Sequence, residues 1–241
     1  MKCDVLTLFP EMVAAVLGQS ILKRAQAAGL LDVRVHPLRD FTRNGQADDF
    51  PYGGGPGMVL KPEPIFAAVE QIQKERGAVR LILPSPQGVR FSQSLARDFS
   101  EEARSLLFIC GHYEGIDARV QAEWRPEEVS VGDYILTGGE LAALVMIDAA
   151  TRLIPGVLGD PASIEEESFA SSLLEYPHYT RPQMFRERAV PEVLVSGHHA
   201  EIRRWRRRQS ILTTLEKRPD LLAGAGLTEE ERAWVGQTVE S

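Results

Sequence analysis

Short apolar runs alternate with longer amphipathic segments over the first two thirds of the chain. The apolar runs, which predict strands, cover residues 3–9, 31–38, 78–83, 106–110 and 128–131. The amphipathic segments, which predict helices, cover residues 11–28, 62–76, 92–103, 117–124 and 139–153. Strands that alternate with helices are typical of an α/β fold with a mainly parallel sheet. We therefore predict one α/β domain over residues 1–160.

The pattern changes after Ile154. Residues 155–167 are rich in Gly, Pro and acidic side chains and have no periodic apolar face, which indicates a linker. From about Ser196 onward the pattern is helical, with one long helix and two short helices near the C-terminus. We predict a linker over residues 161–175 and a small α-helical domain over residues 176–241.

Three of the predicted strands continue directly into turns rich in glycine and proline. These segments are 81–88, 106–115 and 129–140. The carboxyl ends of parallel strands share one edge of a sheet, and ligands bind there because backbone N–H and C=O groups are free of the ladder. Glycine lets the backbone approach a flat ligand closely. The pattern predicts a site for an adenine-like or nucleoside ligand, and the alternative is three ordinary βα turns.

Composition and charge narrow the class of protein. The 241 residues are 44% apolar and 25% charged, and no apolar run approaches the ~18 residues of a membrane span. Asp4 and Glu11 interrupt any signal-peptide core. Cys3 and Cys110 lie in strand-like runs, which suits buried thiols in a reducing compartment and predicts a cytoplasmic protein without membrane contact. The net charge of −7 disfavours a polyanionic partner, but five arginines within residues 203–208 form a local patch suited to nucleic-acid phosphates.

Several common chemistries lack their motif. The glycine-rich loop 53–58 is not followed by the Lys-Ser/Thr pair of a P-loop, and no strand ends in G-x-G-x-x-G, so nucleotide hydrolysis and hydride transfer are disfavoured. That loop is either a surface turn or a substrate-contacting segment. Cys110 and His112 are close in sequence and could suggest a nucleophile–base pair, but a buried structural cysteine is the favoured interpretation. The five histidines show no metal-ligand spacing, so no metal-ligating residue is predicted.

Arg152 and Glu167 suit the recognition of a guanine base. The guanine edge offers N–H donors at N1 and N2 and an acceptor at O6. A carboxylate beside N1 can take its proton as a general base, and an arginine beside O6 can stabilise the negative charge that develops there. Glu167 and Arg152 supply these two groups, although acidic residues in a linker usually only face water.

Seven segments, in order along almost the whole chain, resemble one family. They are Phe9-Pro-Glu-Met12, Pro51-Tyr-Gly-Gly-Gly-Pro-Gly-Met58, Cys110-Gly-His-Tyr-Glu-Gly-Ile-Asp117, Ser130-Val-Gly-Asp-Tyr-Ile-Leu-Thr-Gly-Gly-Glu140, Ile154-Pro-Gly-Val-Leu-Gly159, Tyr179-Thr-Arg-Pro182 and Ser196-Gly-His-His-Ala-Glu-Ile-Arg-Arg-Trp-Arg206. They resemble the bacterial tRNA (guanine-N1)-methyltransferases, the TrmD family of the SPOUT superfamily.

The resemblance implies a fold and an activity. The fold is the SPOUT α/β type with a deep C-terminal trefoil knot, a rare exception to the usual topology rules. The activity is methyl transfer from S-adenosyl-L-methionine to N1 of the guanosine immediately 3′ of the anticodon in tRNA. The resemblance also implies a homodimer with a shared active site and a divalent cation, magnesium. The residues it implies for the cofactor are Pro86, Gly111, Tyr113, Glu114, Val131, Gly132, Asp133, Tyr134, Ile135 and Leu136.

The resemblance assigns the remaining roles as follows. Glu167 is the catalytic base with Arg152 as its partner, and the residues that bind tRNA are Ser168, Glu175, Arg203, Arg206 and Arg207. At positions 167 and 175 the family usually has Asp, so a longer side chain must reach the same atom and we expect the linker to adjust. Three alternatives stay open: a SPOUT methyltransferase for another RNA base, a non-catalytic RNA-binding module, and, more remotely, a nicotinamide oxidoreductase.

Overall fold

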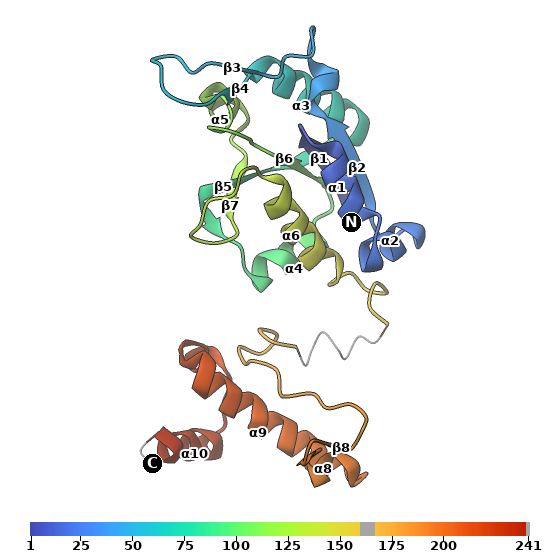
Figure 1. Ribbon diagram of the computed structural model, residues 1–241, viewed down its shortest axis with the longest axis vertical. Helices are drawn as coiled ribbons and strands as arrows, with labels where there is room; N and C mark the ends of the chain where they lie inside the picture. The colour runs from blue at the N-terminus through green and yellow to red at the C-terminus, as the bar shows by residue number, and fades with distance from the viewer. Residues whose placement is uncertain (160–166, 240–241) are drawn as a thin grey trace. The chain divides into compact units, whose positions relative to one another are not determined.

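The computed structural model describes residues 1–159 and 167–239 (Figure 1). The chain divides into two compact units, Met1–Gly159 and Asp160–Ser241. Each unit has a buried core of its own. Residues 161–166 of the predicted linker lie outside the described residues. Within the part that is described, no helix combines the length and the apolar character that crossing a bilayer requires.

The first unit is built on a parallel sheet of five strands. The strands are β1 (Lys2–Thr7), β2 (Asp32–Pro37), β5 (Val79–Arg90), β6 (Ser105–Ile109) and β7 (Glu127–Ser130). Their order is β2-β1-β6-β5-β7, and every pairing is parallel. The predicted α/β class with a mainly parallel sheet is confirmed, and the trefoil knot stays a prediction.

Helices cover both faces of this sheet because its central strands are apolar on both sides. One core joins Leu106 and Phe108 of β6 to α1 (Pro10–Leu17), α2 (Ser20–Ala27), α4 (Gln93–Glu101) and α6 (Glu140–Thr151). The other core joins Leu107 and Ile109 to α3 (Pro62–Arg76) and α5 (Ala118–Trp124). The side-chain period of two along β6 therefore places alternate residues in opposite cores. Figure 1 shows α6 and α4 across the sheet from α3 and α5.

The connection from β2 to α3 also has some structure of its own. It holds the short 3-10 helix η1 (Leu38–Phe41) and a two-residue antiparallel ladder between β3 (Asp48–Asp49) and β4 (Val59–Leu60). The glycine-rich loop closes this ladder.

A buried charge cluster connects β1 to its neighbours. Asp4 accepts hydrogen bonds from His36, Ser105 and Arg76.

The single helix predicted over residues 11–28 is wrong, because the segment forms two helices. α1 ends at Leu17, and the N–H of Gly18 donates to the C=O of Ala14. Ser20 has a φ of 48°, in the left-handed region that a continuous helix excludes. The apolar periodicity carries on across this break, which explains why the pattern predicted one element.

The second unit is mainly helical and also contains one short hairpin. The hairpin, β8 (Met184–Phe185) and β9 (Arg188–Ala189), precedes the helices. The helical elements are α8 (Glu192–Val195), α9 (His199–Lys217), η2 (Pro219–Gly224) and α10 (Glu229–Val239). Leu173, Ile211 and Ala225 form its buried core, with Trp234 packed against them. The strands of the hairpin are exposed, so no buried apolar run marked them in the sequence.

Candidate functional site

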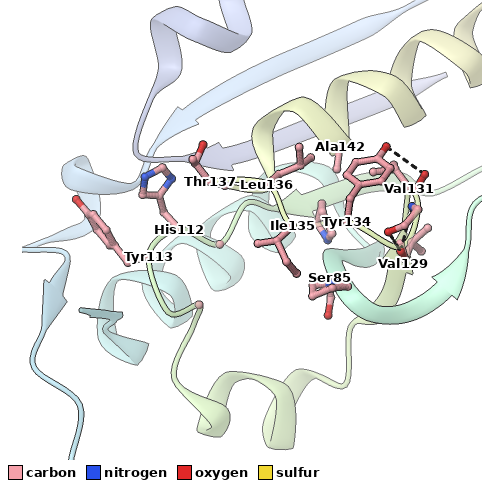
Figure 2. Close-up of a pocket in the computed structure, with 18 of the residues that line it drawn as sticks. Ser85, His112, Tyr113, Val129, Val131, Tyr134, Ile135, Leu136, Thr137 and Ala142 are labelled. Atoms are coloured by element: carbon pink, nitrogen blue, oxygen red, sulfur yellow. Dashed lines mark hydrogen bonds between the residues drawn. The ribbon is translucent and has the colours of Figure 1, made fainter. Parts of the chain in front are cut away.

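A cleft of about 210 Å³ opens at the carboxyl ends of β5, β6 and β7. The three turns that follow these strands form its walls. The lining residues are Pro84–Pro86, Gly111–Gly115, Val129–Gly132, Tyr134–Gly139 and Ala142. Figure 2 shows His112 and Tyr113 toward one end of the cleft and Val131 and Tyr134 toward the other. The three strand ends that the sequence predicts to form one pocket therefore do meet at one cleft.

Two glycines bring the wall after β7 against the end of β6. A Cβ on Gly139 would lie 3.0 Å from the Cα of Cys110, and the N–H of Gly139 donates to the C=O of Gly111. A Cβ on Gly138 would lie 2.3 Å from the carboxylate of Glu140 and 2.5 Å from Nδ1 of His112. Only glycine permits this close approach. The packing of these strand ends and the shape of the cleft therefore depend on the same two glycines.

The buried carboxylate of Glu140 contacts residues that hold the wall of the cleft in place. Glu140, the first residue of α6, is 2% exposed and accepts a 2.7 Å hydrogen bond from the hydroxyl of Thr7. Its second carboxylate oxygen lies 3.9 Å from Nδ1 of His112. The imidazole of His112 packs beside the rings of Phe9 and Tyr113, with centroid distances of 4.8 and 4.7 Å. This network fixes the loop that carries the Gly111–Gly115 wall.

Cys110 lies at the base of the same wall and is not a nucleophile. Its thiol is buried, and burial raises its pKa well above the usual value, with a further contribution from the charge of Glu140. A thiol with a raised pKa stays protonated and unreactive at neutral pH. Cys3 is also free and buried, and burial raises its pKa to about 12. The predicted buried thiols are confirmed.

Nine of the ten residues predicted to hold the cofactor line this cleft. The tenth, Asp133, points away: its side chain is 88% exposed, and its carboxylate accepts a 2.6 Å hydrogen bond from Arg90. The prediction missed Ser85, His112, Thr137 and the glycines beside them, which also line the cleft. The signal for these residues was present, because all of them fall inside the turns that the sequence singled out.

Arg152 belongs to the first unit but lies far from this cleft along its helix. Arg152 directly follows the last residue of α6, whereas Gly139 and Ala142 at the start of α6 line the cleft. A helix of 12 residues is about 18 Å long. Arg152 is therefore separated from Ala142, the last residue of α6 that lines the cleft, by most of the length of this helix.

The predicted base and its neighbours belong to the second unit. Glu167 and Ser168 are partly buried, and the C=O of Glu167 accepts from the N–H of Ala170. The hydroxyl of Ser168 accepts a 3.0 Å hydrogen bond from the N–H of Glu175. The carboxylate of Glu175 pairs with Nε2 of His178 at 2.8 Å. The structure thus brings Ser168 and Glu175 together.

A second cleft, of about 620 Å³, lies between α9 and α10. Its lining includes Arg203, Arg204, Arg207, Arg208 and Trp234. Arg207 donates two hydrogen bonds, of 2.8 and 3.0 Å, to the carboxylate of Glu231, and this pairing raises the pKa of Arg207 and lowers that of Glu231.

The arginines predicted to bind tRNA differ in their surroundings. Arg203 is exposed in the second cleft, whereas Arg207 is held by Glu231. The guanidinium of Arg206 instead lies 4.8 Å from the centre of the Tyr176 ring. The five-arginine run therefore does not present all of its charge on one surface.

No group of three or more His, Cys, Asp or Glu side chains that could hold a metal ion occurs among residues 1–159 and 167–239. The described part of the chain therefore does not offer a ready site for the divalent cation that the resemblance implies.

Comparisons with known proteins agree with these features. The family model described as tRNA (Guanine-1)-methyltransferase TrmD matches residues 1–224. A tRNA (guanine-N(1)-)-methyltransferase from Carboxydothermus hydrogenoformans is 57% identical over 239 residues, covering 98% of this chain and 93% of that protein. Proteins of the same name from Pelotomaculum thermopropionicum and Staphylococcus epidermidis are 55% and 53% identical over 236 and 234 residues. These two alignments each cover 96% of this chain and 94% and 95% of those proteins.

Proposed function

Because the chain belongs to the TrmD family of tRNA (guanine-N1)-methyltransferases, we propose that it methylates N1 of a guanosine in tRNA with S-adenosyl-L-methionine as the methyl donor. We further propose that the target is the guanosine immediately 3′ of the anticodon. The observation that carries the proposal is the cleft at the ends of β5, β6 and β7, whose lining includes nine residues of the implied cofactor set.

The lining of this cleft suits a nucleoside with a cationic sulfur. Glycines 111, 115, 132, 138 and 139 line the cleft without side chains, so the backbone there can come close to the flat purine ring. Leu136, Val131 and Ala142 supply apolar surface, and Glu114 supplies a carboxylate for the positive charge of the ligand. When bound, S-adenosyl-L-methionine supplies an electrophilic methyl group on a sulfonium.

Proton removal from the base falls to Glu167 in this proposal. N1 of guanine carries a proton, so a carboxylate has to take it as the N1–methyl bond forms and the sulfur–methyl bond breaks. Arg152 stabilises the negative charge that develops on O6.

The position of Arg152 supports a shared site in a homodimer. Arg152 lies about 15 Å along α6 from Ala142, the last residue of this helix that lines the cleft, too far to reach a guanine beside the cofactor. An exposed apolar surface on α1 and α6 supports the same proposal: Met12, Val16, Leu141 and Val145 are each more than 40% exposed. A second copy that covers this surface would bring its own Arg152 and Glu167 to the cleft.

The second unit is proposed to hold the RNA. Arg203 and Arg204 are exposed on α9, and their guanidinium groups suit phosphate oxygens.

The free thiols of Cys3 and Cys110 support a reducing, cytoplasmic location. No step of the proposal passes through a metal, because the described residues offer no group of ligands for one.

Transfer of a labelled methyl group tests this proposal. The protein is incubated with labelled S-adenosyl-L-methionine and tRNA transcripts that carry guanosine or adenosine 3′ of the anticodon. Labelling of the guanosine transcript alone, with a reverse-transcription stop at that position, is the expected result. Equal labelling of both transcripts would indicate a methyltransferase for another base. Binding of tRNA without any labelling would indicate a non-catalytic RNA-binding module.

A further inference from the structure

The loop between β3 and β4 carries the two most exposed aromatic side chains in the described part of the chain. Tyr52 is fully exposed, at 101% of the reference area, and Phe50 is 78% exposed. Figure 1 shows this loop in blue, extending from the β3–β4 ladder. Large apolar rings exposed to this degree on a loop have no role in the core of the protein, so their surroundings must be considered for a role in binding.

The loop is attached directly to the wall of the cofactor cleft. The N–H of Glu114 donates a 3.0 Å hydrogen bond to the C=O of Met58, and the N–H of Leu60 donates at 2.9 Å to the C=O of Gly115. Gly57 packs against the side chain of Glu114, since a Cβ there would lie 2.6 Å from its carboxylate. The segment that carries Tyr52 is therefore held beside the end of the cleft formed by Tyr113 and Glu114.

The glycines that follow Tyr52 are not explained by packing. A Cβ on Gly53, Gly54 or Gly55 would meet no atom within 4 Å, although each has a positive φ. These residues shape a projecting turn without being pressed against anything in the unit. The turn holds Tyr52 outside the fold, where a partner can reach both faces of its ring.

Single-stranded RNA is the partner whose chemistry fits an exposed ring beside this cleft. A guanosine methylated at N1 must have its Watson–Crick edge free, so it and its neighbours are unpaired when the base enters the site. Unpaired bases stack on aromatic side chains. Arg119 of α5, whose side chain is 70% exposed and pairs with Asp117, adds a cation near the base of the loop, because the N–H of Asp117 donates to the C=O of Leu60.

We propose that Tyr52 is a substrate-binding residue that stacks on an unpaired base of the tRNA adjacent to the methylated guanosine. This inference rests on the proposed function. Tyr52 contributes to RNA affinity and to the position of the target base, and it does not contact the methyl donor. The phenol ring provides the stacking surface, so its hydroxyl is dispensable.

The test compares three substitutions at position 52 in the full-length protein. Tyr52→Ala and Tyr52→Leu remove the aromatic face, whereas Tyr52→Phe retains it. We expect the first two to raise the Kd for the tRNA transcript about 10-fold or more, to raise KM similarly, and to leave the Kd for S-adenosyl-L-methionine unchanged. Tyr52→Phe should bind tRNA within about twofold of the unsubstituted protein. Equal tRNA affinity in all four proteins would overturn the proposal.

An abasic substrate identifies the stacked base. Removing the base on each side of the target guanosine in turn should weaken binding to the unsubstituted protein at one position and leave binding to Tyr52→Ala unchanged there. If each abasic transcript weakens binding to both proteins equally, Tyr52 contacts something other than a base, and the proposal is wrong. Absence of methyl transfer by the unsubstituted protein would instead refute the proposed function, while the binding measurements would still report on Tyr52.

Discussion

The carboxylate of Glu140 faces Nδ1 of His112 at 3.9 Å, in the interior next to the cleft at the ends of β5, β6 and β7. Both groups are shielded from water, and Nδ1 of His112 has no hydrogen-bond partner among the described residues. The pair joins the first residue of α6 to the loop that forms one wall of the cleft. A substitution that adds atoms between these two side chains should therefore lower the affinity of the cleft for its ligand.

Gly138→Ala tests this dependence. The added Cβ would crowd the Glu140 carboxylate and Nδ1 of His112, and Glu140 is buried and held by its hydrogen bond from Thr7. We expect affinity for S-adenosyl-L-methionine to fall by about 1–3 kcal/mol, measured by titration calorimetry. Gly226→Ala is the control, because a Cβ there meets nothing within 4 Å. An unchanged Kd for Gly138→Ala would show that Glu140 and His112 make room for the added methyl group without weakening ligand binding.

Thr7→Val keeps the shape of the side chain but removes two hydrogen bonds, the one that the hydroxyl donates to Glu140 and the one that it accepts from the N–H of Phe9. The buried carboxylate then loses a partner, so we expect the free energy of unfolding to fall by about 1–3 kcal/mol in urea denaturation. Thr151→Val is the matched control. Thr151 is equally buried, and its hydroxyl makes no hydrogen bond to a described residue, so this substitution should be neutral or stabilising.

The Thr7–Glu140 contact also marks the limit of what the sequence could predict. Each parallel strand and the three strand-end turns follow from local apolar runs and glycines, so the sheet and the cleft were predictable. The Thr7–Glu140 bond joins residues separated by 133 positions, and no local pattern encodes it. The break at Ser20 was missed because a single left-handed residue interrupted an otherwise continuous periodicity. Which ligand the cleft holds stays a prediction.

Asp4 should control stability in acid. Burial alone would raise the pKa of Asp4, but hydrogen bonds from His36, Ser105 and Arg76 hold it below its usual 3.8. A carboxylate with a lowered pKa stabilises the fold above its unfolded-state pKa, and the stabilisation is lost as the pH falls through the lower, folded-state value. Asp4→Asn should therefore cost about 3 kcal/mol at pH 7, and less as the pH falls below about 4.

Denaturant unfolding of the Asn variant and the unsubstituted protein across this pH range provides the measurement. Asp32→Asn is the control, because Asp32 pairs with the same Arg76 but is half-exposed. Its removal should cost only about 0–1 kcal/mol. Equal costs for the two substitutions would contradict the importance of the buried position.

Glu167→Gln separates catalysis from binding. The amide keeps the size of the side chain but cannot accept the N1 proton, so we expect methyl transfer to fall by about 100-fold or more. The Kd for S-adenosyl-L-methionine and that for tRNA should stay the same. Glu167→Asp restores the residue usual in the family and should retain activity. Unchanged turnover in the Gln variant would remove Glu167 from the mechanism.

Arg203 and Arg207 should respond differently to salt, although they are one helical turn apart on α9. Arg203 is exposed, whereas Arg207 is held by two hydrogen bonds to Glu231. A phosphate contact releases a counterion, so losing it lowers the slope of log Kd against log salt by about 1. We expect that change for Arg203→Ala, measured by filter binding between 50 and 300 mM salt (an approximate range that brackets physiological ionic strength). Arg207→Ala should instead leave the slope unchanged and lower the thermal stability, since it leaves Glu231 without its partner. A salt slope that falls equally in both variants would show that the Glu231 pair opens when RNA binds.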